Sequence, residues 1–377
     1  MFFKNARIFC EDFTFRTGAF EVRDGRFVVN MPRSVPSGAI DLRGATVIPG
    51  LVDIHCHGAM GADFSDGDDQ GLRKMARYLA GRGVTSFAPA SMTLPYEALE
   101  RAFATAARLA GERPGGCARL MGIHMEGPYL SPAKRGAQNP AHLRRPDFEE
   151  FERLWSACGG LIRIVDVAPE LPGAQGFIRR AAGLCTVSVA HTDAGYPQAK
   201  AAFDAGATHL THLYNAMPGI HHRDPGVIPA ACENPAVRAE VICDGYHVHP
   251  AAVRFAFAAF GAERMILISD SGRCCGMPEG KYDLGGQNVF LEGGVARLAD
   301  GTIACSAADL YACMTMAMGF GIAEEDAVRA ATFNPARAIG RDGEIGSIST
   351  RKWADFVVCS EDYTSKRVFI GGVEIQG

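Results

Sequence analysis

Two histidines separated by one residue end an apolar, strand-like run of the sequence. His55 and His57 follow the run 46–54, and Gly58 comes directly after them. Side chains alternate between the two faces of a strand, so both imidazoles point to the same side and can reach one metal ion. The glycine ends the strand, which places the pair at its carboxyl end, where enzymes built on parallel barrels carry their chemistry. Cys56 lies between the histidines and faces away from them.

Ionisable side chains recur at the ends of other apolar runs. Glu126, His191, His212 and Asp270 each stand at or near the end of such a run. A carboxylate in the position of Glu126 can bridge cations, or it can cap the helix that follows. Imidazole and carboxylate donors suit Zn²⁺ or Fe²⁺. Because the sequence has no C-x-x-C pair, the pattern favours a catalytic metal site with an open position for water over a structural zinc site.

Two further histidines lie close to these positions. His209 and His212 are an odd number of residues apart, so on a regular strand only one of them lines the barrel interior. We expect that residue to be His212, and we expect His209 to pack against the helical layer. His124 shares its parity with Glu126 but lies one layer deeper, which favours a hydrogen-bonded core residue over a metal ligand.

Apolar runs alternate with Ala-rich helical stretches through the middle of the chain, as at 70–81 and 96–111. This alternation is typical of βα units on a parallel sheet. The candidate strands end near His55, Pro89, Glu126, Pro169, His191, His212, Asp244 and Asp270. Eight such units predict an α/β fold of the (β/α)8 TIM barrel type. An open doubly wound sheet is the weaker alternative, because no G-x-G-x-x-G motif follows the first strand.

The two ends of the chain carry short alternating strands instead. The hairpin signal Asp24-Gly25 joins two of them, and the runs 354–359 and 366–370 form another pair near the C-terminus. Strands at opposite ends predict one small β-sandwich domain that both termini build. We expect this domain to comprise residues 1–48 and 345–377, and the catalytic barrel to comprise residues 49–344.

Composition narrows the class of protein. The 377 residues include 38 Lys and Arg against 42 Asp and Glu, a net charge of -4 without a long run of one sign, which predicts no nucleic-acid or membrane partner. Residues 1–7 lack the features of a secretory signal, so we expect a cytoplasmic protein with reduced, mostly buried cysteines. The uncharged segment 310–323 is shorter than the roughly 18 apolar residues of a membrane span and predicts a buried helix.

Taken together, the motifs resemble the amidohydrolase superfamily and, within it, the N-acetylglucosamine-6-phosphate deacetylases. The run Pro49-Gly-Leu-Val-Asp-Ile-His-Cys-His-Gly58 marks only the superfamily. Thr211-His-Leu-Tyr-Asn-Ala-Met-Pro218, with a later arginine, is far more specific to the deacetylases. Further matches at 124–130, 244–247 and 334–340 extend the resemblance over nearly the whole chain.

The resemblance implies a metal-ligand set. Glu126, His191 and His212 would hold the principal ion, and His55 and His57, with Glu126 as a bridge, would hold a second one. No lysine stands where other branches of the superfamily carry a carboxylated bridging lysine, so Glu126 takes that part. Some relatives work with a single ion. The resemblance therefore implies one or two divalent ions, Zn or Fe, per subunit.

The implied reaction is metal-assisted hydrolysis of the acetamide of N-acetylglucosamine 6-phosphate to glucosamine 6-phosphate and acetate, in amino-sugar catabolism. Asp270 would accept the proton of the attacking water and return it to the departing amine. His247 would polarise the acetyl carbonyl. Arg223 and the segment Asn215-Ala216 would bind the 6-phosphate. The full set of substrate contacts that the resemblance implies is Ala137, Asn215, Ala216, Arg223, His247, Ile303, Ala304 and Cys305.

Two departures from the family pattern leave the sugar epimer open. Ala304-Cys305-Ser306 carries a thiol where many relatives have only small residues, and the run 272–276 also differs. N-acetylgalactosamine 6-phosphate is therefore an alternative substrate. Another amidohydrolase, such as a cyclic amidase or a nucleobase deaminase, would have no use for Arg223, and a sugar-phosphate sensor without turnover would lack the base Asp270. The resemblance also implies a homodimer, because a partner subunit often completes such sites.

Overall fold

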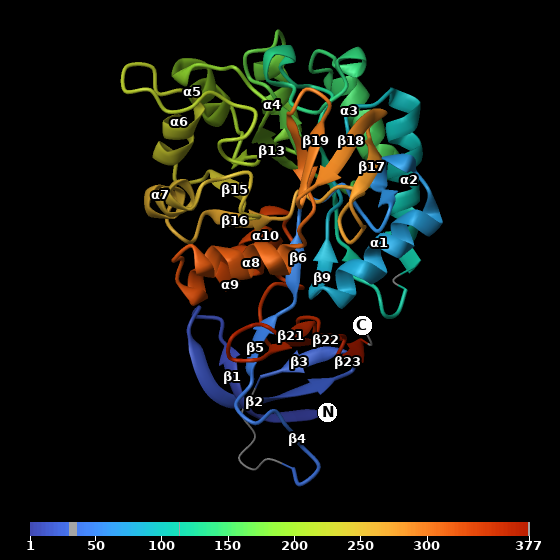
Figure 1. Cartoon of the computed structure of the whole chain (residues 1–377), viewed down its shortest axis with the longest axis vertical. Coiled ribbons are helices and arrows are strands. Elements are labelled where there is room, and N and C mark those ends of the chain that lie inside the picture. The colour runs from blue at the N-terminus through green and yellow to red at the C-terminus, as the bar shows by residue number, and fades with distance from the viewer. Residues whose placement is uncertain (30–35, 113, 376–377) are drawn as a thin grey trace.

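A computed structural model describes residues 1–29, 36–112 and 114–375 of the chain. It has two bodies stacked along its longest axis, a barrel surrounded by helices and a smaller β domain that holds both ends of the chain (Figure 1). The chain first passes from the smaller body to the barrel through the consecutive pair β5 (Thr46–Pro49) and β6 (Leu51–Asp53), one strand in each body. Gly50 joins them, and a side chain there would collide with Thr85, since an added Cβ would lie 2.0 Å from its Oγ1.

The barrel is a curled parallel sheet. Its order is β6-β9-β10 and then β11-β12-β13-β14-β15-β16, and a parallel bridge between Ala90 and His124 joins the two parts. The sheet closes where Asp270 N donates to His55 O at 2.9 Å and His57 N donates to Ser271 O at 2.7 Å. Because β10 and β11 are halves of one interrupted strand, the predicted eight-stranded TIM barrel is confirmed. The strands after β6 are β9 (Val84–Phe87), β10 (Arg119–Leu120), β11 (Ile123–Met125), β12 (Ile162–Val167), β13 (Thr186–Val189), β14 (His209–Leu210), β15 (Arg238–Ile242) and β16 (Met265–Ile268).

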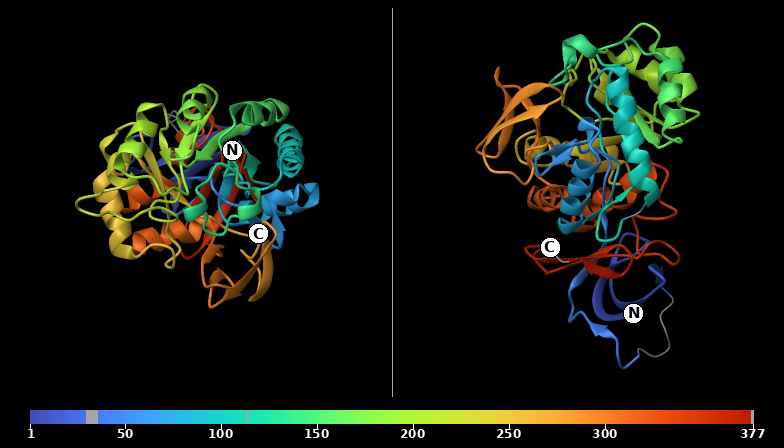
Figure 2. Two further views of the ribbon diagram at one scale, coloured as in Figure 1. Left: turned by 90° about the horizontal axis from the view of Figure 1, so that it is seen from above. Right: turned by 90° about the vertical axis from the view of Figure 1, so that its right-hand side faces the viewer.

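Helices follow these strands and surround the barrel when it is seen from above (Figure 2, left). In α1, the side chain of the N-cap Asp68 accepts from two backbone N–H groups, and Leu72, Met75, Ala76 and Leu79 form one buried stripe at helical spacing. The helices are α1 (Asp69–Gly81), α2 (Tyr96–Glu112), α3 (Phe148–Ala157), α4 (Ala174–Ala181), α5 (Tyr196–Asp204), α6 (Val227–Glu233), α7 (Pro250–Phe260), α8 (Leu310–Gly319), α9 (Glu324–Ala331) and α10 (Phe333–Ala338), with short 3-10 turns at Phe64–Asp66, Pro132–Lys134 and Pro140–His142. The apolar segment at 310 is the buried helix α8, and no helix in the described ranges is long and apolar enough to cross a membrane.

Strands from both termini form one sheet in the smaller body. In the order β23-β22-β21-β5-β1-β2-β3, three strands from the C-terminal end lie beside four from the N-terminal end, and β4 pairs with β1. Asp24 and Gly25 adopt the left-handed conformation that a two-residue hairpin turn requires, so the hairpin prediction is confirmed. The sheet curls around an aromatic core. Its strands besides β5 are β1 (Phe2–Phe9), β2 (Phe15–Arg23), β3 (Arg26–Val28), β4 (Ile40–Asp41), β21 (Phe356–Cys359), β22 (Lys366–Ile370) and β23 (Val373–Ile375).

The exact division of the chain into residues 1–48 with 345–377 and residues 49–344 stays a prediction. Residues 30–35 and 376–377 of the predicted β domain, and residue 113 of the predicted barrel, lie outside the described residues.

A four-stranded antiparallel sheet follows β16 and was not expected from the sequence. It stands beside the mouth of the barrel (Figure 1), and Ser306 N donates to Asp270 O at 2.8 Å, which ties its last strand to the end of β16. Its strands are β17 (Gly280–Leu284), β18 (Gln287–Glu292), β19 (Val295–Leu298) and β20 (Ile303–Ser306), and a small hairpin of β7 (Gly58–Ala59) and β8 (Ala62–Asp63) lies after the first barrel strand.

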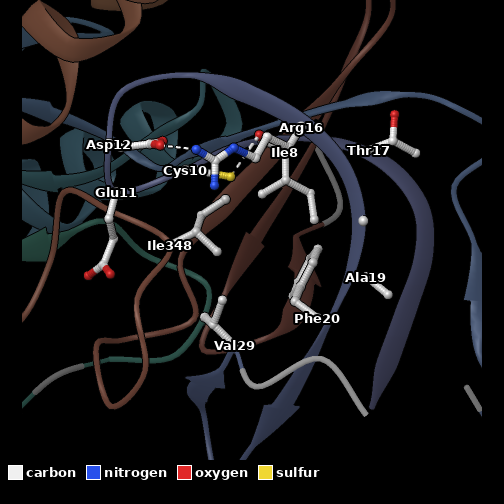
Figure 3. A pocket seen from close by; sticks show the side chains of 11 residues that line it. Ile8, Cys10, Glu11, Asp12, Arg16, Thr17, Ala19, Phe20, Val29 and Ile348 are labelled. Atoms are coloured by element: carbon white, nitrogen blue, oxygen red, sulfur yellow. Dashed lines mark hydrogen bonds and ion pairs between the residues drawn. The ribbon is translucent and has the colours of Figure 1, made fainter. Parts of the chain in front are cut away.

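The β domain encloses a cavity of about 400 Å³ (Figure 3). Its floor is apolar, with Ile8, Phe20 and Ile348, and Asp12 pairs with Arg16 at the edge. Among the described residues, no cluster of His, Cys, Asp or Glu suited to a metal ion lies there. The cavity therefore offers apolar surface and little chemistry.

Candidate functional site

A second cavity, of about 430 Å³, opens at the carboxyl ends of the barrel strands. Residues from the strand ends, from the loop 133–138 and from β20 line it. Of the residues predicted from the sequence, the cavity brings together His57, Glu126, Ala137, His191, His212, Asn215, Ala216, His247, Asp270, Ile303 and Ala304. His55 lies directly beneath the wall and is fully buried.

Glu126 is the centre of the buried donor groups. Its Oε1 lies 2.9 Å from His191 Nε2 and 3.1 Å from His212 Nε2, and the two Nε2 atoms are 3.0 Å apart. On the other side, Glu126 Oε2 lies 3.3 Å from His57 Nε2, and Oε1 lies 3.6 Å from His55 Nε2. The carboxylate therefore lies between two imidazole pairs. Together with Glu126, either pair, His191 and His212 or His55 and His57, could hold a metal ion.

Hydrogen bonds on the far side of the rings orient the imidazoles. His191 Nδ1 lies 2.9 Å from Lys134 O, and His57 Nδ1 lies 3.1 Å from Ala90 O. A carbonyl oxygen can only accept, so each Nδ1 carries the proton, and in the neutral ring each Nε2 lone pair points toward Glu126. Converging lone pairs repel one another unless a cation lies between them. The donor set thus fits a divalent metal ion, and carbonyl-bound histidines of this kind are typical of metal sites.

Three of these side chains sit where the backbone leaves its strand. His191, His212 and Asp270 have positive φ angles of 41°, 29° and 49°, an uncommon conformation that clusters at functional sites.

The turn after Leu210 changes one expectation about the histidines of this strand. The prediction that His209 packs against the helical layer is wrong, because its Nε2 lies 3.0 Å from Glu240 Oε1 in the barrel interior. The parity rule fails because β14 ends at Leu210, before His212.

Asp270 lies beside the second imidazole pair. Its Oδ1 is 3.2 Å from His57 Nε2 and 3.5 Å from His55 Nε2. Burial disfavours its charge, but in the metal-free protein a hydrogen bond from protonated His57 and the positive charges of protonated His55 and His57 outweigh burial and hold the pKa of Asp270 below its usual range. The carboxylate is therefore ionised at neutral pH and able to accept a proton.

His247 is held by a carboxylate of its own. Its Nδ1 lies 2.7 Å from Asp244 Oδ2, while Asp244 Oδ1 accepts from the backbone N–H groups of Tyr246 and His247, each at 2.9 Å. Burial opposes the charge of Asp244, but these bonds and the charge of His247 lower the pKa of Asp244 to about 2. The same contact outweighs burial and raises the pKa of His247. This pairing leaves Nε2 of His247 as the nitrogen free to act on a group in the cavity.

Two predicted substrate residues lie elsewhere. Arg223 is exposed and is not part of the cavity wall of its own chain; its guanidinium lies 2.6 Å from His222 Nε2. Cys305 belongs to β20, but its side chain is buried among apolar neighbours that include Cys274, while Ile303 and Ala304 line the cavity. A side chain on Gly272 would collide with the Cys305 sulfur, at 2.2 Å from an added Cβ. The thiol therefore packs against the run 272–276 and leaves the cavity wall to its neighbours.

Two residues that contact these donor groups were not predicted from the sequence. Gln138 Nε2 donates to Glu126 Oε2 at 2.7 Å, and Gln138 Oε1 accepts from Thr93 N at 2.7 Å. Glu240 Oε2 lies 3.0 Å from His55 Nδ1. Gln138 stands in a loop with no motif to mark it. Glu240 could have been found from the sequence, because a lone carboxylate inside an apolar strand needs a hydrogen-bonding partner when it is buried. The predicted core position of His124 is confirmed by its bonds to Ile54 O at 3.0 Å and Asp166 Oδ1 at 2.9 Å.

Comparison with known proteins identifies the family. The profile of the amidohydrolase family matches residues 46–375. The chain belongs to the amidohydrolase family. The match spans the whole barrel, including Glu126, both imidazole pairs and Asp270. Amidohydrolases in general depend on divalent metal ions, which agrees with the two donor groups around Glu126.

Individual relatives within the amidohydrolase family carry more specific names. The chain is 36% identical over 367 residues to the N-acetylglucosamine-6-phosphate deacetylase of Bacillus subtilis, covering 95% of this chain and 93% of that protein. It is 34% identical over 353 residues to the N-acetylgalactosamine-6-phosphate deacetylase of Escherichia coli O157:H7, covering 93% of each. A mutant N-acetyl-D-glucosamine-6-phosphate deacetylase of Mycobacterium smegmatis, solved with N-acetyl-D-glucosamine 6-phosphate, superposes with a TM-score of 0.92 at 34% identity, over 100% of this chain and 99% of that one. The resemblance inferred from the motifs is thus confirmed.

Proposed function

We propose that the protein hydrolyses the acetamide of N-acetylglucosamine 6-phosphate to glucosamine 6-phosphate and acetate. The observation that carries the proposal is the convergence of imidazole Nε2 atoms on the buried carboxylate of Glu126, directly beneath a cavity large enough for a small molecule. Similarity to deacetylases of amino-sugar phosphates over nearly the full chain supports this substrate class.

We assign Glu126, His191 and His212 to the principal ion, and His55 and His57, with Glu126 as a bridge, to a second ion. Imidazole and carboxylate ligands suit Zn²⁺ or Fe²⁺. A divalent ion bound there supplies Lewis-acid activation of water and of the acetyl carbonyl. The fixed tautomers of His57 and His191 support this assignment, because their protons already point away from the centre.

The chain itself supplies the proton transfers. Asp270 accepts the proton of the attacking water and returns it to the nitrogen of the sugar as the C–N bond breaks. His247 donates from Nε2 to the oxygen on which negative charge develops. Asp244 holds that ring in place through Nδ1, so the donating nitrogen faces the cavity. Ala137, Ile303 and Ala304 then form walls against the sugar.

Phosphate binding is proposed to involve Arg223 together with Asn215 and Ala216. Asn215 and Ala216 line the cavity, whereas Arg223 does not line the cavity of its own chain. We therefore propose a homodimer in which a partner subunit completes the site. The reaction would take place in the cytoplasm, since all twelve cysteines are free, as expected in a reducing compartment.

N-acetylgalactosamine 6-phosphate is the second candidate substrate. A deacetylase of that epimer aligns with 93% of this chain at 34% identity, so the similarity to the two classes is nearly equal. The buried thiol of Cys305 lies directly behind the wall formed by Ile303 and Ala304, the part of the site where this chain departs from the family pattern.

Acetate release from both epimers, measured side by side on protein of known metal content, tests the proposal. We expect turnover of at least one sugar phosphate and little turnover of the unphosphorylated sugars. Arg223→Ala should raise KM for the phosphorylated substrate and leave the slow reaction of the unphosphorylated sugar unchanged. The absence of acetate from both epimers with Zn²⁺ or Fe²⁺ bound would overturn the assignment.

A further inference from the structure

Glu240 is a fully buried carboxylate in the middle of β15, beneath the metal-ligand set. Its Oε2 lies 3.0 Å from His55 Nδ1 and 3.3 Å from the backbone N of His212, and its Oε1 lies 3.0 Å from His209 Nε2. A buried charge is costly unless it is paired and hydrogen-bonded. Glu240 meets that condition with three donors. One belongs to His55, a proposed ligand of the second ion, one to His212, a proposed ligand of the principal ion, and one to His209.

These contacts determine where the proton of His55 resides. The backbone N–H of His212 always donates, and His209 Nδ1 is buried without a partner, which leaves its Nε2 as the donor to Glu240. Glu240 therefore accepts from every direction, and His55 must present a proton on Nδ1. The other nitrogen of that ring, Nε2, is buried without a hydrogen bond and faces Glu126 and Asp270.

His55 differs from the other rings in the nature of its acceptor. His57 and His191 donate from Nδ1 to carbonyl oxygens, whereas His55 donates to a carboxylate. A carboxylate on the far nitrogen of an imidazole fixes the tautomer and makes the ligating nitrogen more basic. The effect of Glu240 should therefore be greatest on the pair that contains His55.

A metal ion between His55, His124 and Glu240 is a competing reading of the same cluster, since their donor atoms lie close together. His124 argues against it. Both of its ring nitrogens already have protein acceptors, Ile54 O and Asp166 Oδ1. The cluster therefore orients His55 and does not present a ligand set of its own.

We propose that Glu240 is a positioning residue that fixes His55 with its proton on Nδ1 and thereby sets the affinity of the group His55, His57 and Glu126 for a second divalent ion. The inference rests on the proposed metal site and adds a residue that touches neither the ion nor the substrate. It predicts that the number of bound ions depends on a side chain one layer below the site.

Zinc binding to Glu240→Gln tests this proposal, because the amide keeps the size of the side chain and removes its charge. Bound zinc is measured by elemental analysis after equilibration with buffered free Zn²⁺. We expect the second ion to bind roughly 10- to 100-fold more weakly than in the wild-type protein, with the first ion changed by less than about 3-fold. His209→Gln is the matched control. It perturbs the same carboxylate through Oε1 and leaves the bond to His55 intact, so it should retain the second ion.

Histidine-selective ¹⁵N NMR of the zinc-loaded wild-type protein gives a measurement that needs no variant. The His55 ring should carry its proton on Nδ1. A proton on Nε2, a wild-type protein that binds only one ion at saturating zinc, unchanged second-ion affinity in Glu240→Gln, or an equal loss in His209→Gln would each overturn the proposal. Neither measurement uses substrate, so a failure of the deacetylase assignment would be seen separately, in the acetate assay.

Discussion

The two bodies of the molecule enclose cavities of similar size that differ in chemistry. The cavity at the barrel mouth is about 430 Å³ and that in the β domain is about 400 Å³. Beneath the first lie carboxylates and imidazoles held by directional hydrogen bonds. Through Phe20, the second borders an aromatic core in which Phe356 stacks on Phe369 with ring centroids 4.5 Å apart. Volume alone therefore does not make a site, because the reacting groups must also be held in fixed orientations.

The two cores also differ in what they contribute to the free energy of folding. Phe3, Phe20, Phe27 and Phe356 are almost completely removed from water, and burial of apolar area is favourable and non-directional. Glu126 and Glu240 are just as buried, but each carboxylate costs free energy that its hydrogen bonds must offset. We therefore expect substitutions in the β domain to change stability, and substitutions at the strand ends to change the reaction.

Asp270→Asn should give the largest effect on the reaction. The amide cannot accept the proton of water, so kcat should fall by roughly 10²- to 10⁴-fold. Substrate should still bind, because the change keeps the shape of the side chain. Acetate release and substrate binding by calorimetry check this. A variant with near-normal kcat would remove Asp270 from the role of base.

Phe356→Ala should give the largest effect on stability. The ring packs against Phe3, Phe20, Phe27 and Phe369, and its removal should cost about 3–5 kcal/mol in the free energy of unfolding. Urea unfolding measures the loss, with kcat per folded molecule expected to stay unchanged. The exposed Val373 of the same sheet is the control, and Val373→Ala should change stability by less than about 0.5 kcal/mol. A large fall in the kcat of the fully folded variant would mean that the core of the β domain also affects the reaction.

The contact between Asp244 and His247 should make the free energy of unfolding depend on pH in acid. Its pKa of about 2 in the folded protein is below the unfolded value of 3.8, so its contribution is present above about pH 4 and is lost as the pH falls toward 2. The difference corresponds to about 2 kcal/mol. The free energy of unfolding of metal-free Asp244→Asn should therefore depend less on pH between 4 and 2 than that of the wild-type protein. The pKa of His247 should also fall in this variant. Equal pH dependence in both proteins would refute this contribution.

Arg7→Ala should give the smallest effect. Arg7 of β1 and Glu324 of α9 form a two-pronged ion pair between the bodies, with both N–O distances 2.6 Å. The pair is partly exposed, so solvent screening limits its contribution to at most about 1 kcal/mol. Thermal unfolding at low and high salt should show a small, salt-dependent loss, with kcat unchanged. A large change in kcat would mean that the contact between the two bodies influences the site.

Much of the architecture could be predicted from local pattern. The alternation of apolar runs and helices predicted the barrel, the Asp24-Gly25 turn predicted the first hairpin, and His55 and His57 marked a strand end. These features depend on neighbouring residues, so periodicity and turn chemistry report them directly. The antiparallel sheet β17–β20 was not predicted, because its short strands follow the last barrel strand, where the repeating βα pattern predicts only a loop.

What the sequence by itself determined is the kinds of donor present and the strand ends that carry them. Only the tertiary structure decided which nitrogen of each ring faces the centre, that His209 turns inward, and that Glu240 lies beneath His55. Those outcomes depend on partners 28 to 185 residues away in the chain, such as Glu240 for His55 and for the backbone of His212. Directional hydrogen bonds between distant strands leave no periodic trace along one strand. The types of donor group were thus encoded locally, and their orientation was fixed by closure of the barrel.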